Sequence, residues 1–297
     1  MSFGNRAGVL AFIGVLVGLP AAVPAQANPW GGAKQAAGKY AEVNGIKLYY
    51  EIHGSGRPLI LLHGGLGAIS MFGPNLSALA RGRQVIGVDL QGHGRTADID
   101  RPLRADLMAG DIAALIKYLK LERPDIMGYS MGGWVALLTA SKYPDLVGKL
   151  VVASSPFRRT GFYPEILAMQ AQVNAAAAEQ MKGTPMYELY MSVAPRKEDW
   201  PRLLEKIGDL MKQDFDYSKE LAALRAPTLI VAGDADIFPP SHAVEMFQLL
   251  GGGKKDPGWD GSGRPVHQLA ILPGLTHYNS FMAIALSETV IPFLDRK

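Results

Sequence analysis

The clearest pattern of hydrophobic and polar positions along the chain begins with two short strand-like runs. These are residues 40–43 and 46–52, and Asn44-Gly45 separates them. Asn-Gly between two such runs is the strongest short-range signal for a β-hairpin. Later runs are continuously apolar rather than alternating, which indicates strands covered on both faces, as in a parallel sheet. These runs are 58–62, 84–88, 125–128, 150–153, 228–232 and 269–272.

Helix-like segments separate these apolar runs, notably residues 104–120 and 133–142. Strands that alternate with helices predict an α/β fold, here an antiparallel edge hairpin that leads into a doubly wound, mostly parallel sheet. We expect this core to span residues 40–156 and 215–297.

The alternation stops at residues 157–214, where only helical stretches are found. We expect this segment to be a helical cap, inserted between two strands and lying over the sheet. Its predicted helices are Pro164 to Lys182, Thr184 to Val193 and Asp199 to Lys212. Its methionines can line a pocket for apolar substrates, although for any one of them ordinary packing is the preferred interpretation. These methionines are Met169, Met181, Met186, Met191 and Met211.

A second insertion, residues 251–265, lies between a helix and the last strand. Loops that lead from a helix into a strand lie at the end of the sheet away from the strand C-termini, so this one should point away from the chemistry. Trp259 can anchor the loop or contact a partner, but packing is the preferred interpretation.

The N-terminal residues have the pattern of a targeting segment rather than that of the strands and helices of the core. Positive charge on Arg6 and the amino group is followed by an apolar run, residues 7–19, and then by Ala25-Gln26-Ala27, a small-x-small cleavage pattern. This order predicts a signal peptide over residues 1–27, with cleavage after Ala25 as the alternative, and an exported protein, periplasmic or secreted. The run is shorter than the roughly 18 residues of a membrane span, so we expect no stable membrane insertion. An uncleaved anchor is the alternative, and residues 28–39 should be a flexible lead-in.

Composition narrows the function classes. The 297 residues are 48% hydrophobic, which is enough for a large core. The formal charge of +3 is spread without a basic block, which argues against nucleic acid as a partner. Cysteine is absent, which excludes thiol nucleophiles, disulfides and thiolate metal sites. The sequence has no metal-ligand cluster and no dinucleotide fingerprint, so we expect neither metal nor cofactor.

The segment Gly128-Tyr129-Ser130-Met131-Gly132 has the Gly-x-Ser-x-Gly form and lies between a strand-like and a helix-like run. In that setting a sharp turn lifts the serine hydroxyl clear of the sheet, as a nucleophile requires. The alternative is a serine that only caps the helix N-terminus. Strand, turn and helix together favour the nucleophile.

A serine nucleophile needs a base at the same edge of the sheet, where the strands have their C-terminal ends. His277 follows strand 269–272 through the turn Pro273-Gly274-Leu275-Thr276, so it is the predicted base. The other histidines are placed elsewhere: His53 ends the hairpin, His63 and His93 brace loops, His242 lies in a helix where solvent exposure is the default, and His267 precedes the last strand.

The base needs an acid to orient it, and strand 228–232 is followed by Asp234 and Asp236. Asp236 lies farther along the turn and can reach the His277 loop, whereas Asp234 can cap the turn through the backbone. We therefore predict Asp236. For the oxyanion, the predicted backbone donors are Met131 and Gly65, with Leu66 as the alternative to Gly65.

Taken together, these motifs resemble those of the α/β-hydrolase family from Tyr40 to the C-terminus. The resemblance rests on His63-Gly64-Gly65, Asp89 to Arg95, Gly128 to Gly133, Gly233 to Asp236 and Gly274 to His277. It again selects Asp236 as the acid and implies a cap at 157–214. The signal peptide and the 251–265 insertion depart from the family pattern.

The sequence thus predicts an exported serine hydrolase with Ser130, His277 and Asp236 as its catalytic residues, acting on a small molecule, most simply an apolar carboxylic ester. Serine at position 130 argues against epoxide hydrolases and haloalkane dehalogenases, which use a carboxylate nucleophile. Cleavage of carbon–carbon bonds, lactones or amides, or peracid formation, stays open on the same triad. A non-catalytic small-ligand receptor is the alternative of another class.

Overall fold

The computed structural model describes residues 38–296. The predicted signal peptide, and the predicted lead-in up to residue 37, lie outside the described residues. The first strand, β1 (Lys39–Val43), begins inside the range expected for the lead-in.

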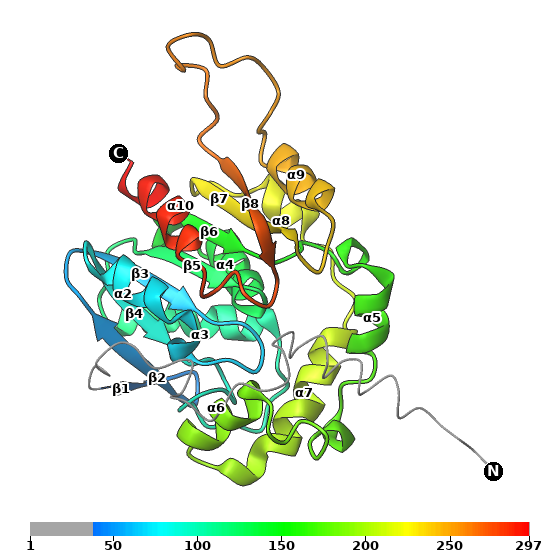
Figure 1. Cartoon of the computed structure of the whole chain (residues 1–297). Coiled ribbons are helices and arrows are strands. Elements are labelled where there is room, and N and C mark those ends of the chain that lie inside the picture. Colours follow the sequence, from blue (N-terminus) through cyan, green and yellow to red (C-terminus); the bar gives the residue numbers. More distant parts are fainter. Residues whose placement is uncertain (1–37, 297) are drawn as a thin grey trace.

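An eight-stranded sheet forms the centre of the molecule, with strand order β1-β2-β4-β3-β5-β6-β7-β8 (Figure 1). β2 pairs antiparallel with β1 and with β4, and every later pairing is parallel. This arrangement confirms the predicted doubly wound, mostly parallel α/β fold. The other strands are β2 (Ile46–His53), β3 (Arg57–Leu62), β4 (Arg83–Val88), β5 (Asp125–Tyr129), β6 (Leu150–Ala153), β7 (Thr228–Ala235) and β8 (Gln268–Thr276).

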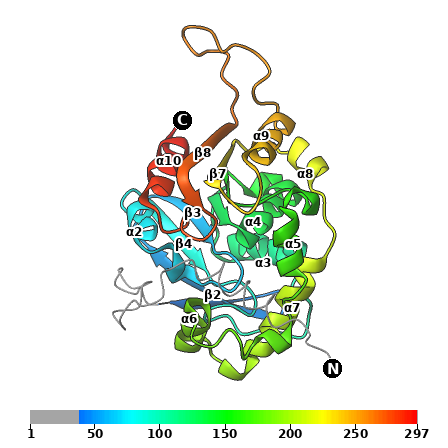
Figure 2. The ribbon, with the colours of Figure 1, turned by 45° about the vertical axis from the view of Figure 1, so that its right-hand side comes forward.

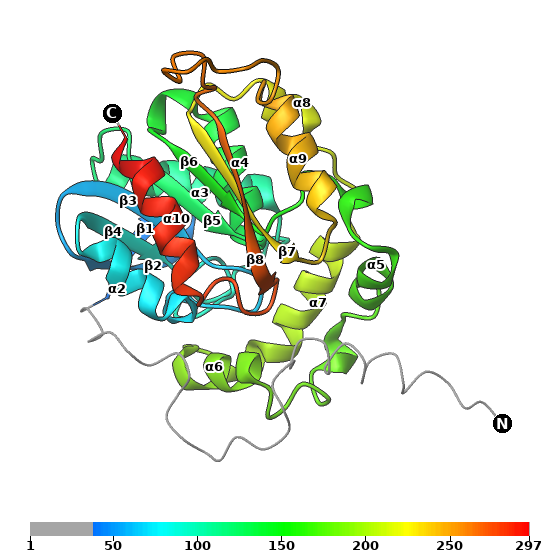
Figure 3. The same cartoon turned by 45° about the horizontal axis from the view of Figure 1, so that its top comes forward.

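Helices cover both faces of the sheet (Figure 3). One face packs against α3 (Ala105–Tyr118), α4 (Met131–Lys142), α8 (Ser218–Ala222) and α9 (Pro240–Leu249). The other face packs against α2 (Pro74–Ala80) and α10 (Ile284–Asp295). Within β3, Ile60 and Leu62 lie in the first core and Leu59 and Leu61 in the second. Burial on both faces is the physical reason for the continuous apolar runs.

The segment between β6 and β7 carries α5 (Pro164–Gln170), α6 (Pro185–Val193) and α7 (Trp200–Lys212). It leaves and rejoins the core at neighbouring points, since the Tyr217 N–H donates to the Phe157 carbonyl at 2.8 Å and the Arg159 N–H to the Phe215 carbonyl at 2.9 Å. These helices lie beyond the strand C-terminal ends (Figure 2).

One predicted helix of this segment is wrong, because Pro164 to Lys182 is not continuous. α5 ends at Gln170, and a short 3₁₀ turn follows at Ala175–Ala177. The Asn174 side chain accepts a hydrogen bond from the Ala176 N–H at 2.9 Å, so it competes locally with the helix. The Val173 carbonyl also packs directly on Gly208 of α7, where a Cβ would lie only 2.0 Å away.

The 251–265 insertion projects from the end of the sheet opposite to α5 and α7 (Figure 1). Trp259 on this loop is fully exposed, so the packing interpretation was wrong. The predicted turn at residues 273–276 is wrong as well, because β8 continues through it to Thr276. Among residues 38–296, no helix has the length and apolar character needed to cross a membrane.

Candidate active site

Ser130 lies at the sharp connection between β5 and α4, with φ of 53°. Its N–H donates to the Ala153 carbonyl of β6 at 2.9 Å. A Cβ on Gly132 would lie 2.5 Å from the carbonyl oxygens of Leu62 and His63, so only glycine permits this close approach. Ser130 occupies the N-cap position of α4, but its hydroxyl makes no capping hydrogen bond.

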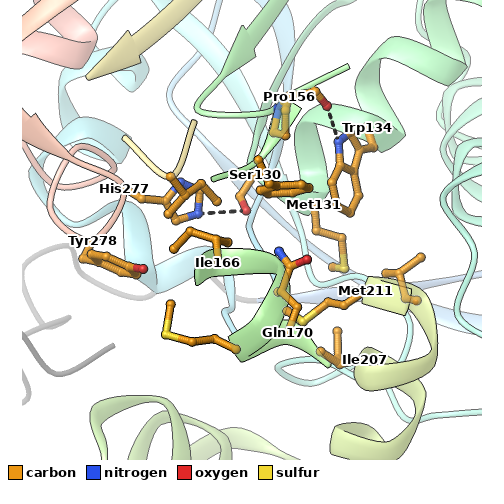
Figure 4. A pocket seen from close by; sticks show the side chains of 15 residues that line it. Ser130, Met131, Trp134, Pro156, Ile166, Gln170, Ile207, Met211, His277 and Tyr278 are labelled. Atoms are coloured by element: carbon orange, nitrogen blue, oxygen red, sulfur yellow. Dashed lines mark hydrogen bonds between the residues drawn. The ribbon is translucent and has the colours of Figure 1, made fainter. Parts of the chain in front are cut away.

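The hydroxyl of Ser130 instead meets the imidazole of His277, with 3.1 Å between Oγ and Nε2 (Figure 4). On its other side, Nδ1 of His277 lies 2.8 Å from Oδ1 of Asp236. An ionised carboxylate only accepts hydrogen bonds, so Nδ1 carries the proton and Nε2 is left to accept from the serine. The structure thus brings the three side chains predicted from sequence into one hydrogen-bonded chain.

Asp236 is buried and held in place from several directions. Its carboxylate accepts from the backbone N–H of Ile237 at 2.8 Å and of Gly233 at 3.3 Å, besides His277. Burial alone would raise the pKa of this carboxyl, but attraction to the protonated form of His277 and the hydrogen bonds from His277, Ser154 and Ile237 outweigh it, so the pKa of Asp236 is lowered. The alternative acid, Asp234, is exposed on β7 and accepts from the Gly274 N–H at 2.8 Å.

The predicted oxyanion donors lie beside this chain, since Gly65 and Met131 line the same pocket as Ser130 and His277. The loop of Gly65 is held by His63, whose Nδ1 donates to the Gly64 carbonyl at 2.7 Å and whose Nε2 accepts from the Leu90 N–H at 3.0 Å. Burial lowers the pKa of His63 to about 3. A neutral imidazole therefore joins two loops, and it is not placed to exchange protons with Ser130.

The pocket itself is a largely apolar cavity of about 90 Å³. α7 contributes Ile207, Leu210 and Met211, and α5 contributes Ile166, Met169 and Gln170 (Figure 4). Of the five methionines named from sequence, Met169 and Met211 line the cavity, whereas Met181 is buried in the core.

Sequence reasoning missed several residues of this pocket, notably Trp134, Gln170 and Tyr278. Trp134 is held by its Nε1–H, which donates to the Pro156 carbonyl at 2.7 Å. Tyr278 follows His277, and burial together with the Asp236 charge raises its pKa to about 12. Tyr278 could have been found as the neighbour of the predicted base, His277, but Gln170 gives no signal in the sequence.

A cluster of charged side chains attaches α7 to the core. Nζ of Lys206 lies 2.6 Å from Oδ2 of Asp98 and 2.8 Å from the carbonyl oxygens of Ile99 and Arg101. Nε of Arg202 lies 2.8 Å from the same Asp98 oxygen. Ile207, which lines the pocket, follows Lys206 in α7. The cluster therefore also fixes the part of the pocket wall that Ile207 forms.

The remaining histidines lie away from Ser130, although one placement was wrong. His53 contacts Glu51, and His267 accepts from the Thr228 N–H at 3.2 Å. His242 is buried rather than exposed, because it stacks on Phe157 and accepts from the Phe157 N–H at 3.2 Å. Within the described part of the chain, no group of three or more His, Cys, Asp or Glu side chains is arranged to hold a metal ion.

Comparison with known proteins agrees with this architecture. The sequence model of the alpha/beta hydrolase fold matches residues 57–197. Serine hydrolase BPHL of Homo sapiens is 36% identical over 249 residues, 80% of this chain and 82% of that protein. The AB hydrolase superfamily protein YisY of Bacillus subtilis is 33% identical over 226 residues, 68% of this chain and 82% of that protein.

Among solved structures, a thermophilic esterase from Thermogutta terrifontis superposes with a TM-score of 0.66 at 23% identity, covering 88% of this chain and 98% of the esterase. The fold and these relatives define a hydrolase. The chain belongs to the α/β-hydrolase fold family.

Proposed function

We propose that this protein is a serine hydrolase of short-chain carboxylic esters. The observation that carries the proposal is the Ser130–His277–Asp236 chain, with 3.1 Å and 2.8 Å between successive partners, at the wall of an apolar pocket. A nucleophile next to a base that an acid orients is the arrangement of acyl transfer.

The proposed reaction has two halves. Nε2 of His277 takes the Ser130 proton while Oγ attacks the ester carbonyl carbon, and the oxygen of the tetrahedral intermediate is stabilised by the backbone N–H groups of Gly65 and Met131. The imidazolium then gives its proton to the departing alkoxide, which leaves an acyl group on Ser130. Water attacks this acyl group with His277 again as base, and the free acid is released.

The size of the cavity supports short acyl groups. At about 90 Å³ it is smaller than the cavities of about 150 Å³ that hold a benzene ring in protein cores. It therefore suits an acyl chain of a few carbons. None of its lining residues among those described is Lys or Arg, so nothing there would neutralise a substrate carboxylate, and an uncharged ester is favoured.

Active-site labelling and a chain-length series test this proposal. Purified protein should react with a fluorophosphonate probe, whereas Ser130→Ala should not, and His277→Ala should react far more slowly. Activity on p-nitrophenyl esters should be highest for acetate to butyrate and fall beyond hexanoate. Folded protein that neither labels nor hydrolyses any ester would refute the enzyme and favour a non-catalytic receptor. Labelling without ester turnover would favour carbon–carbon, lactone, amide or peracid chemistry on the same residues.

We also propose that the protein is exported, on the strength of the N-terminal pattern alone. The mature chain should then begin at Asn28, which N-terminal sequencing of protein from the native host would establish. Recovery of a chain that still carries residue 1 would contradict processing.

A further inference from the structure

Gln170 is an unusual residue for the place that it occupies. It is the last residue of α5 and only 6% exposed. Among the pocket-lining residues that the described segment 157–214 contributes, Gln170 alone is polar; the others are Phe162, Ile166, Met169, Ile207, Leu210 and Met211. Figure 4 shows its carboxamide directed from α5 towards the space below Ser130 and Met131.

The carboxamide oxygen of Gln170 is covered and has no hydrogen-bond partner among the described residues. A buried amide oxygen without a donor lowers stability, whereas an apolar side chain of the same shape would not. A group left in this condition in a native protein needs an explanation, and a partner from outside the chain is one. Trp134, by contrast, has its indole N–H satisfied by the Pro156 carbonyl at 2.7 Å.

Two of the other polar side chains of the pocket, Ser130 and His277, have a different task. Ser130 and His277 bond to each other at 3.1 Å, and under the proposed function they meet the scissile carbonyl. The amide of Gln170 is therefore available for another part of the substrate. A half-turn about the Cγ–Cδ bond exchanges its oxygen and nitrogen, so it can offer an acceptor or a donor. It carries no charge and would not balance a carboxylate or an ammonium group.

We propose that Gln170 is a specificity-determining residue that binds one uncharged hydrogen-bonding group of the acyl chain, and that the preferred substrates are esters of short hydroxy-acids rather than of plain alkanoic acids. The inference rests on the proposed ester hydrolysis. A hydroxyl on the acyl chain suits the site because it can accept from the amide nitrogen or, after the half-turn, donate to the amide oxygen, while its carbon atoms remain among the surrounding isoleucine, leucine and methionine side chains.

A matched pair of substrates tests the proposal. The ratio of kcat/KM for p-nitrophenyl 3-hydroxybutyrate to that for p-nitrophenyl butyrate should be about 5 to 10 in the native enzyme, the contribution of one hydrogen bond. Gln170→Met, similar in length but without the amide, should bring this ratio to about 1 or below, because the hydroxybutyrate ester loses a contact that the butyrate ester never makes. The control is Gln172→Met, a partly exposed glutamine two residues along that does not line the cavity; it should leave the ratio unchanged.

Stability gives a second, independent readout. Gln170→Met should keep or raise the melting temperature, because an unpaired amide is removed; a drop of several degrees would show a structural role and overturn the proposal. An equal ratio in the native enzyme and in Gln170→Met, with labelling and butyrate turnover intact, would overturn the role of Gln170 and leave the proposed function standing. Absence of both labelling and ester turnover in the native protein would overturn both.

Discussion

Replacing Asp236 by asparagine is the most direct probe of the site. The donors around the carboxylate include His277 Nδ1 at 2.8 Å, the Ile237 N–H at 2.8 Å and the Gly233 N–H at 3.3 Å. The Ser154 hydroxyl is a further one. In the carboxylate, one oxygen accepts from His277 and Ile237 and the other from Gly233. Asparagine has only one oxygen, so an NH₂ group must take one of these two positions. With its NH₂ group facing His277, it would force the proton onto Nε2, which could then no longer accept from Ser130. With its NH₂ group facing Gly233, two donors would meet.

The magnitude follows from the charge that is lost. In the proposed transition state His277 is positive, and a carboxylate whose oxygen lies 2.8 Å away stabilises that charge by roughly 6 kcal/mol at an effective dielectric constant of about 20. Each 1.36 kcal/mol corresponds to about tenfold in rate, so kcat should fall by about 10⁴. KM should change little, because the ground state holds a neutral imidazole.

The assay is steady-state hydrolysis of p-nitrophenyl acetate, with circular dichroism to check the fold. The matched control is Asp234→Asn on the exposed part of β7, which loses an exposed charge but can still accept from the Gly274 N–H through its amide oxygen, and it should stay within about threefold of native activity. A loss below tenfold for Asp236→Asn, or a larger loss for Asp234→Asn, would show that Asp236 does not orient the base.

Three further outcomes are expected. Lys206→Met removes three hydrogen bonds between α7 and the core, so the free energy of unfolding should fall by about 2 kcal/mol and KM for short esters should rise; unchanged values of both would contradict the anchoring role. Gly132→Ala places a Cβ 2.5 Å from two carbonyl oxygens and should destabilise the protein by about 2 kcal/mol or more in urea titrations, and a neutral effect would refute the close packing of the turn. Burial lowers the pKa of His63 to about 3 and of His93 to about 4, while it raises that of Asp89 to about 6. Burial also lowers the pKa of His242 to about 4. Between pH 6 and 4 the unfolded chain therefore holds three histidine protons that the folded state lacks, whereas the folded state holds one carboxyl proton that the unfolded chain lacks, so stability should fall on acidification by about 2.7 kcal/mol per pH unit; a flat profile would contradict this.

The positions of Ser130, Asp236 and His277 could be predicted because each depends on chain order. Each follows a strand whose apolar run is visible in the sequence, and parallel strands bring their C-terminal ends to one edge. The sheet was predictable for the same reason, since burial on both faces leaves a continuous apolar signature.

Features that depend on contacts between distant segments could not be predicted in this way. In the sequence His242 looks like any polar residue of a surface helix, yet Phe157, from another part of the chain, stacks on it and covers it. The break after Gln170 depends on the Val173 carbonyl packing against Gly208. Gln170 itself looks like any polar helix residue, because the direction of a side chain on the inserted segment is set by how α5 packs, which no local pattern records.

The paired backbone bonds where segment 157–214 leaves and rejoins the core, Tyr217 to Phe157 and Arg159 to Phe215, have a consequence for evolution and engineering. Ser130 precedes the first junction, whereas Asp236 and His277 follow the second, so recombination at these two sites would exchange the whole segment as a module. A new repertoire of substrates could be acquired by such grafting, while the proposed catalytic residues would be inherited unchanged.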